Sequence, residues 1–222
     1  MNIVEAIRSR KSIRGFKPEG VPKEILREVL EIATRAPSAM NTQPWEFAVL
    51  TGNVLDEIRD ANVAMLSSRL AGDRTLPRVP LEGVYRQRQV DLAIQLFNLM
   101  GIARDDREKR AEWGLRGLRF FDAPAAIILY VESSRARSYV DFDLGAFAQT
   151  ICLAALSYGL GTCIEDQGVL FPEVVRRFTG IPESKRIVVS IALGYPDWDF
   201  PANRLETSRE PVGNIAKWCG FD

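Results

Sequence analysis

Apolar residues recur along this chain with helical and strand periods, and helical segments outnumber strands. Asn2 followed by Glu5 is a capping-box pattern, which predicts a short helix over residues 3–10. Pro22 begins a second helical segment that should end before Pro37. Its expected apolar face is Ile25, Val29 and Ile32 with Ala33. Asn53 is the expected cap of a third helix, which has Leu55, Ile58 and Met65 on one face. Further helices are predicted over residues 88–102 and 143–159, and a short one from Pro172.

Three segments have the pattern of strands. "EFAVLT" (46–51) alternates weakly and is stopped by Gly52. "APAAIILYVE" (123–132) and "RIVVSIALGYP" (186–196) are nearly continuous apolar runs, as in strands buried on both faces. No internal repeat is visible. These elements together predict an α+β fold with a central sheet.

The composition restricts the chemistry more than the fold. With 29 Lys+Arg against 29 Asp+Glu, the chain has no net charge, so wholesale binding to nucleic acid or to an anionic membrane is not expected. The chain contains no histidine, which argues against common zinc and iron sites and against Ser-His-Asp hydrolysis. The three cysteines have no CxxC spacing, which favours reduced thiols in a cytoplasmic protein. An enzyme of this composition would depend on a cofactor, and we predict no metal.

The segment from Leu144 to Ile164 carries no charge and is long enough to span a bilayer. It contains polar residues and the helix-breaking "GLGT", and acidic residues flank it on both sides. We therefore interpret it as a central buried helix of a protein without a membrane span. Residues 62–120 are the most charged part of the chain. We interpret them as an excursion over a site or across a partner, within a single domain covering residues 1–222.

A basic cluster follows the first predicted helix. Arg8, Arg10, Lys11 and Arg14 lie within "RSRKSIRGF". Cations suit a helix C-terminus, so a solvated surface explains part of the cluster. Alternatively, arginine side chains, a hydroxyl and free backbone N–H groups can bind a phosphate. The cluster alone does not decide between the two.

Two further stretches carry polar groups on irregular backbone. "PSAMNTQPW" (37–45) offers the donors and acceptors of Ser38, Asn41 and Gln43, which suit the edge of a polar heterocycle as well as an ordinary turn. "NRLETSREP" (203–211) carries Arg204 and Arg209 and is otherwise a surface tail.

Four stretches, in order and spacing, resemble the FMN-dependent nitroreductase family: "RKSIRGF", "APSAMNTQPWEF", "GLGTCIEDQG" and "GYPDWDFPANRLETSREP". The resemblance covers nearly the whole chain and is weakest over residues 62–120. It implies the nitroreductase-like fold, a central mixed or antiparallel sheet surrounded by helices, in an intertwined homodimer with active sites lined by both chains.

The resemblance also implies which residues bind FMN. Arg10, Lys11, Ser12 and Arg14 would hold the flavin phosphate and ribityl chain, and Arg209 would pair with the phosphate; Arg204 is a weaker candidate. The loop of the other subunit would contribute Pro37, Ser38, Ala39, Met40 and Asn41, supported by Gln43. Cys163, Ile164 and Glu165 would lie where the backbone passes the flavin ring. The positive cluster then matches the roughly two negative charges of the phosphate locally.

The implied reaction moves electrons from NADH or NADPH through flavin N5 to a nitroaromatic, a quinone or a related small-molecule acceptor, in a ping-pong sequence. No side chain is required as a catalytic residue, although Arg14 is a candidate to stabilise reduced flavin. Cys163 has no cationic neighbour in the sequence that would lower a thiol pKa, so packing is its expected role. Tyr85, Arg86 and Arg88 are candidates for the substrate pocket or for a nicotinamide dinucleotide phosphate.

Other functions remain open at this point. The same fold is used by flavin-fragmenting enzymes and by reductive dehalogenases, and a flavin-binding or storage protein would need no efficient turnover. A small scaffold protein with a basic surface is the alternative without flavin.

Overall fold

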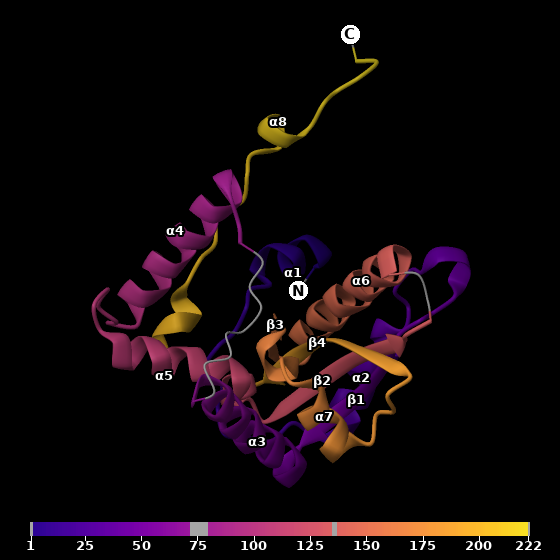
Figure 1. Cartoon of the computed structure of the whole chain (residues 1–222). Coiled ribbons are helices and arrows are strands. Elements are labelled where there is room, and N and C mark those ends of the chain that lie inside the picture. The colour runs from indigo at the N-terminus through magenta and orange to yellow at the C-terminus, as the bar shows by residue number, and fades with distance from the viewer. Residues whose placement is uncertain (1, 72–79, 135–136, 222) are drawn as a thin grey trace.

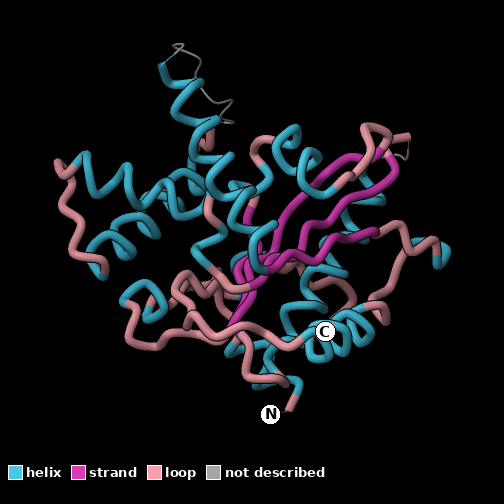
Figure 2. The backbone as a smooth tube through the Cα atoms, turned by 90° about the horizontal axis from the view of Figure 1, so that it is seen from below, coloured by secondary structure: helices cyan, strands magenta, loops and turns pink. Residues whose placement is uncertain are grey.

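The computed structural model describes residues 2–71, 80–134 and 137–221, and a four-stranded sheet lies at its centre. The strands are β1 (Glu46–Thr51), β2 (Ala125–Glu132), β3 (Gly161–Glu165) and β4 (Lys185–Gly194). They lie in the order β1-β2-β4-β3, and every neighbouring pair is antiparallel. Helices cover both faces of the sheet (Figure 2). The predicted α+β class is therefore confirmed. Of the two expected kinds of sheet, mixed or antiparallel, the structure has the antiparallel one.

The two central strands are buried on both faces, as their continuous apolar runs predict. Along β2, Ile127 belongs to one hydrophobic core and Ile128 to the other. In β4, Ile191 lies opposite Ile127, and Ala192 lies opposite Ala126. The strand β3 was not predicted, because its five residues are too few to show a period and the first of them is a glycine. It forms an edge of the sheet, beside β4.

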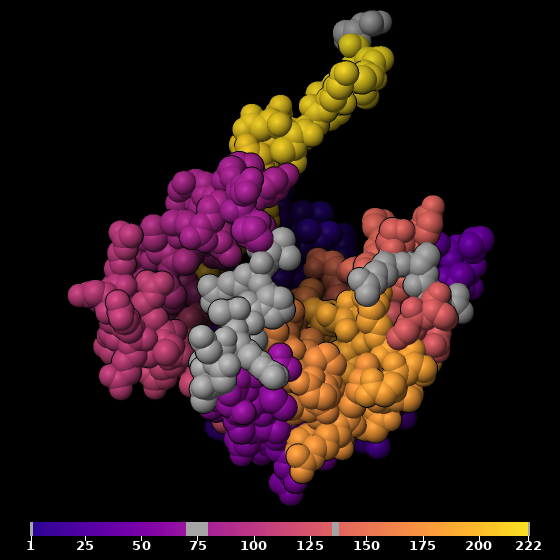
Figure 3. Space-filling model, viewed as in Figure 1, coloured from indigo at the N-terminus to yellow at the C-terminus, as the bar shows by residue number. Residues whose placement is uncertain are grey.

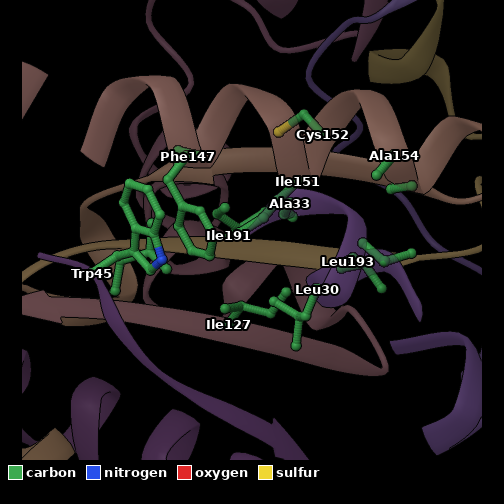
Figure 4. Close-up of a cluster of buried hydrophobic side chains, with 14 of the residues drawn as sticks. Leu30, Ala33, Trp45, Ile127, Phe147, Ile151, Cys152, Ala154, Ile191 and Leu193 are labelled. Carbon is green, nitrogen blue, oxygen red and sulfur yellow. The ribbon is translucent and has the colours of Figure 1, made fainter. Parts of the chain in front are cut away.

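Helices α2 (Lys23–Ala33) and α6 (Arg137–Leu156) cover one face and form the first core (Figure 4). The rings of Trp45 and Phe147 stack there with centroids 4.7 Å apart, so Trp45 is part of the core. The predicted apolar face of α2 was partly wrong. Leu26, Val29, Leu30 and Ala33 are buried, whereas Ile32 is exposed, because the sheet lies one residue further round the helix.

Helix α6 confirms the predicted buried central helix, although it begins six residues before the expected position 143 and ends three residues before 159. Among the described residues, its stretch Ser138–Leu156 is the one helical segment that is long and apolar enough to cross a membrane. Half of that window is buried inside the protein, including Phe147 and Ile151. The apolar composition of the helix is therefore explained by its position against the sheet.

Helices α3 (Gly52–Ala71) and α7 (Pro172–Thr179) cover the other face, together with the short 3-10 turn η2 (Phe120–Asp122). Helix α3 begins at Gly52, one residue before the predicted cap. Leu55 and Ile58 are buried in the second core, and Met65 packs against it, as the period predicts. Gly180 ends α7 in the left-handed conformation, with φ of 72°.

Helices α4 (Gly83–Leu99) and α5 (Arg107–Leu118) stand to one side of the sheet (Figure 1). The predicted helix 88–102 was wrong at both ends, since α4 begins at Gly83 and ends at Leu99. Helix α5 was not predicted, because charges obscure its period; Asp106 caps it by accepting from the backbone of Lys109 at 2.9 Å. The excursion also contains residues 72–79, which lie outside the described residues.

The two ends of the chain differ in how they are attached. Helix α1 (Ile3–Ser9) has both capping-box hydrogen bonds between Asn2 and Glu5, each 3.0 Å long, so the prediction is confirmed. After the 3-10 turn η4 (Pro201–Arg204), the chain runs past α4 to the four-residue helix α8 (Val212–Ile215). The last residues then extend away from the body of the molecule (Figures 1 and 3).

Candidate functional site

The basic segment that follows α1 lies along the outer edge of β3. Ser12 forms a parallel bridge with Thr162, and the backbone N–H of Ile13 donates to the Thr162 carbonyl at 2.9 Å. The Ser12 hydroxyl and the Arg14 guanidinium both lie close enough to influence the Cys163 thiol. The fold therefore brings together two of the stretches that the sequence singled out, residues 10–14 and residues 163–165.

Buried Asn203 holds the end of this segment. Its side-chain oxygen accepts from the backbone N–H groups of Arg14 at 2.8 Å and Gly15 at 3.2 Å. Its side-chain nitrogen donates to the carbonyls of Gly15 and Asp197, each at 2.7 Å. Sequence reasoning missed Asn203, because one asparagine in a proline-bearing tail gives no signal of burial. It fixes the backbone from which the Arg14 side chain projects.

A second support comes from the end of α5. Arg116 donates to the Arg14 carbonyl at 3.2 Å, pairs with Asp122 at 3.2 Å, and lies over the ring of Phe200. The Arg14 guanidinium lies 5.9 Å from the ring centroid of Phe121. These supporting residues could not be predicted from the sequence, since their partners are more than a hundred positions away or belong to an unpredicted turn.

The turn η2 has an uncommon backbone. Phe120, Phe121 and Asp122 have φ values of 53°, 53° and 57°, in the left-handed region that costs a non-glycine residue about 1–2 kcal/mol each. Burial of the two phenylalanines and the ion pairs of Asp122 with Arg116 and Arg119 hold the turn in place. Strain of this kind is concentrated at functional sites. Here it places Phe121 beneath Arg14.

The cations of the cluster have no carboxylate partner among the described residues. Arg10, Lys11 and Arg14 form no ion pair there, while Arg116 and Arg119 nearby are both paired. Lys11 instead lies 5.9 Å from the centroid of the Trp198 ring. In a chain with equal numbers of acids and bases, grouped unpaired cations favour an anion such as a phosphate.

The edge of β3 beyond this bridge presents backbone groups. Alternate residues of a strand direct their N–H and C=O groups to the same edge, so those of Ile164 point the same way as those of Thr162. The Ile164 side chain is 39% exposed, while Cys163 and Glu165 are buried. A flat polar ring placed here would find hydrogen-bonding groups at its edge and cations nearby.

Two buried titratable groups lie on β3. Burial raises the pKa of Cys163 to about 11, although the positive charge of Arg14 opposes this, so the thiol is protonated at neutral pH. This supports the expected packing role. Burial likewise raises the pKa of Glu165 to about 7, opposed by hydrogen bonds that its carboxyl accepts from the Ser190 hydroxyl and the Gly168 N–H.

The loop with Pro37, Ser38, Ala39, Met40, Asn41 and Gln43 lies elsewhere in the same chain. The Ala39 N–H donates to both carboxylate oxygens of buried Asp143 at 3.2 Å, and Ser38 accepts from the Gln43 N–H at 2.9 Å. The loop borders a cavity of about 560 Å³ that Tyr139 and Phe142 also line.

Within one chain, this loop is separated from the basic cluster. The loop is bonded to Asp143 of α6, whereas Arg10 of the basic cluster lies near Cys152 of the same helix. Asp143 and Cys152 are nine residues apart, which corresponds to about 13 Å along the helix. Met40, Asn41 and Gln43 have positive φ, and Met40 is 93% exposed. A strained and exposed loop of this kind is suited to contact a second molecule.

Arg209 is not brought to the cluster by any contact of the described residues. Its guanidinium donates to the backbone of Thr207 and Ser208 and to the Thr207 hydroxyl, and the neighbouring Glu210 pairs with Arg88 of α4 at 2.6 Å. Arg204 is exposed on η4, next to Asn203. The pairing of Arg209 with a phosphate therefore stays a prediction.

Comparison with known proteins identifies the group to which this arrangement belongs. The model of the nitroreductase family matches residues 7–195. This chain belongs to the nitroreductase family. It is 32% identical over 218 residues to a 4-nitrobenzoate reductase of Pseudomonas putida, covering 97% of this chain and 95% of that protein.

Two solved nitroreductase structures show the same fold. The FMN- and NADPH-dependent nitroreductase NfnB of Sphigopyxis sp. strain HMH superimposes with a TM-score of 0.93 at 27% identity, over all of both chains. The FMN-dependent nitroreductase NfnB of Mycobacterium smegmatis, in complex with NADPH, gives a TM-score of 0.89 at 28% identity over 97% of each chain. The resemblance inferred from the four sequence stretches is thereby confirmed.

Proposed function

We propose that this protein is an FMN-dependent oxidoreductase that takes electrons from NADPH or NADH and reduces nitroaromatic compounds. The observation that carries the proposal is the group of cations at residues 10–14, which form no ion pair with a described residue and are held against the open edge of β3. FMN has a phosphate at one end and a flat polar ring at the other, which matches this arrangement. The FMN and NADPH dependence of the relatives supports the same reading.

The chain's own residues would bind and orient the cofactor. Arg10 and Lys11 would neutralise the phosphate, and the Ser12 hydroxyl would contact the ribityl chain. Backbone groups of Ile164 would bind the ring edge. When bound, FMN supplies the hydride chemistry, so no histidine or metal is needed. Arg14, fixed by Asn203 and Arg116, would place positive charge where the reduced ring gathers negative charge.

Replacing Arg14 by Ala should weaken FMN binding by about 1.5–3 kcal/mol, since a charge-assisted hydrogen bond is lost. The measurement is a fluorescence titration of flavin-free protein with FMN. Arg8→Ala is the matched control, because Arg8 is an exposed cation of the same stretch on α1. Equal affinities of the Arg14 variant and the unmodified protein would contradict the assigned role.

An anaerobic absorbance experiment tests the reaction. NADPH or NADH should bleach the flavin band of the FMN-loaded protein, and a nitroaromatic compound should restore it. We extend the proposal to quinones and to ping-pong kinetics, for which double-reciprocal plots at several acceptor concentrations should be parallel. A flavin band that persists with both nucleotides would overturn the oxidoreductase proposal and favour a flavin-binding protein. Consumption of the flavin under oxygen would indicate the flavin-fragmenting chemistry instead.

We also propose that the active form is a homodimer in which both chains contribute to each site. The exposed loop at residues 37–43 and the apolar side chains of Tyr139 and Phe142 beside it suit a surface that a second copy covers. The tail presents four more exposed apolar side chains, which are Val212, Ile215, Trp218 and Phe221. In this arrangement the chain is one domain, and helices α4 and α5 of the excursion reach across the assembly.

Deleting residues 212–222 should convert the dimer to a monomer, because those side chains, each more than 60% exposed in the single chain, need a partner surface. Light scattering after size-exclusion chromatography measures the mass. Lys217→Ala is the control, since it changes an exposed polar side chain of the same tail. A truncated protein that still has the mass of a dimer would show that the tail does not hold the dimer together.

We place this enzyme in the cytoplasm. Cys152 and Cys163 are free and buried, and Cys219 is free and exposed, which suits a reducing compartment.

A further inference from the structure

A large groove lies between α4 and the segment that leads into α5, outside the site described above. Its volume is about 720 Å³, within the range of small-molecule sites. Val90, Ile94, Phe97 and Ile102 give it an apolar lining. Ile94 is 52% exposed, although it lies mid-helix. A groove with such a lining would gain stability from an apolar ligand group.

Positive charge surrounds this lining. Arg86 on α4, Arg104 in the connection and Arg110 on α5 all line the groove, and no aspartate or glutamate of the described residues does so. Arg86 donates to Gln89 at 2.5 Å, and Arg110 donates to the Arg104 carbonyl at 3.2 Å. None of the three guanidinium groups forms an ion pair with a described residue. Three separate chain positions thus bring to one cavity cations that have no carboxylate partner in the described part of the chain.

The arrangement of ring and cation is specific. The Arg110 guanidinium lies over the Phe97 ring, with 4.8 Å between its carbon and the ring centroid. A guanidinium that packs on an aromatic ring keeps N–H donors available at its edge. A ligand that combines a flat ring with a group of several anionic oxygens matches both features. A phosphate has more anionic oxygens than a single carboxylate, so it can pair with more of the three guanidinium groups.

We propose that this groove binds a phosphate-bearing adenine nucleotide. Its ring lies on the apolar lining by Val90 and Ile94, and its phosphate lies among Arg86, Arg104 and Arg110. Two sources have this chemistry, the 2′-phosphoadenosine end of NADPH and a free adenine nucleotide. The first source rests on the proposed function and would make the groove the basis of a preference for NADPH over NADH.

The position of the groove agrees with the first source. Arg110 and Arg116 are both on α5, six residues and thus about 9 Å apart along the helix. Arg116 donates to the carbonyl of Arg14, which belongs to the candidate flavin site. One rigid helix therefore carries both a residue that lines the groove and a residue that supports the candidate flavin site.

Binding of adenosine 2′,5′-bisphosphate to the FMN-loaded protein tests the proposal by isothermal titration calorimetry. The double variant Arg104→Ala/Arg110→Ala should bind it at least tenfold more weakly, since two charge-assisted contacts are lost. Arg177→Ala is the matched control, because Arg177 is also an exposed arginine without an ion pair to a described residue and lies 5.3 Å from the Phe178 ring centroid. It should bind like the unmodified protein.

Steady-state kinetics separates the two sources. A rise in KM for NADPH of tenfold or more in the double variant, with KM for NADH unchanged, would assign the groove to the electron donor. Weaker binding of the bisphosphate with both KM values unchanged would assign it to a free nucleotide. If the unmodified protein does not bind the bisphosphate, or the double variant binds it equally well, the proposal is overturned. That result would leave the proposed function intact, because bleaching of the flavin by NADPH or NADH is measured separately.

Discussion

The free energy of unfolding should fall by about 2.5 kcal/mol between pH 5 and pH 8 through Glu165 alone. This carboxyl has a pKa of about 7 in the folded protein, against an ordinary value of 4.5, because burial disfavours its charged form. Between these two values the folded state binds more protons than the unfolded state, so stability decreases as the pH rises. The contribution is fully present below pH 4.5 and is lost as the pH rises through about 7, at about 1.4 kcal/mol for each pH unit between the two values.

Glu165→Gln provides the measurement. The glutamine side-chain oxygen can still accept from the Gly168 N–H. In the unmodified protein the Ser190 hydroxyl donates to the Glu165 carboxyl, and in the variant the glutamine NH2 group can donate to that hydroxyl instead. Urea unfolding at several pH values, at one protein concentration and constant flavin content, should give a flatter stability profile for this variant. Glu19→Gln is the control, because Glu19 is an exposed glutamate outside the helices and strands. Parallel profiles for Glu165→Gln and the unmodified protein would contradict the prediction.

The hydrophobic pattern predicted the central strands of the sheet correctly, because those two strands are buried on both faces. The continuous runs that became β2 and β4 leave no other interpretation, and β1 ends at Gly52 as its sequence indicates. Patterns failed where contacts from distant parts of the chain decide the structure. The edge strand β3 needs β4 and Ser12 to define it, and α5 has charges on most of its surface.

The sequence predicted the cations of the candidate site, but it did not predict the residues that hold them in place. The sequence indicated Arg10, Lys11 and Arg14 through their concentration in a neutral chain, and the structure leaves them without carboxylate partners among the described residues. The residues that support them could not be found by spacing. Arg116 and Phe121 reach Arg14 from about a hundred positions away, and Asn203 from almost two hundred. Spacing shows which side chains a segment carries, whereas tertiary contacts decide how they are held.

Asn203→Ala should lower the free energy of unfolding by about 3–5 kcal/mol, the largest effect we expect from a single substitution. The Asn203 side chain is 1% exposed and makes four hydrogen bonds to backbone groups of Arg14, Gly15 and Asp197. Its removal leaves those groups without their partner in a buried position, at a cost of about 1–3 kcal/mol for each group that water does not reach. Urea unfolding measures the change, and Asn214→Ala is the control, since Asn214 is exposed and its side chain hydrogen-bonds, among the described residues, to Glu210 alone.

Asn203→Asp separates the two halves of this contact. Aspartate keeps the oxygen that accepts from the N–H groups of Arg14 and Gly15, but it cannot donate to the carbonyls of Gly15 and Asp197. If Asn203 positions Arg14, FMN affinity should fall more in the alanine variant than in the aspartate variant, even where both remain folded. Because the accepted bonds fix the Arg14 backbone, equal losses of FMN affinity in the two variants would mean that Asn203 stabilises the fold without orienting the cation.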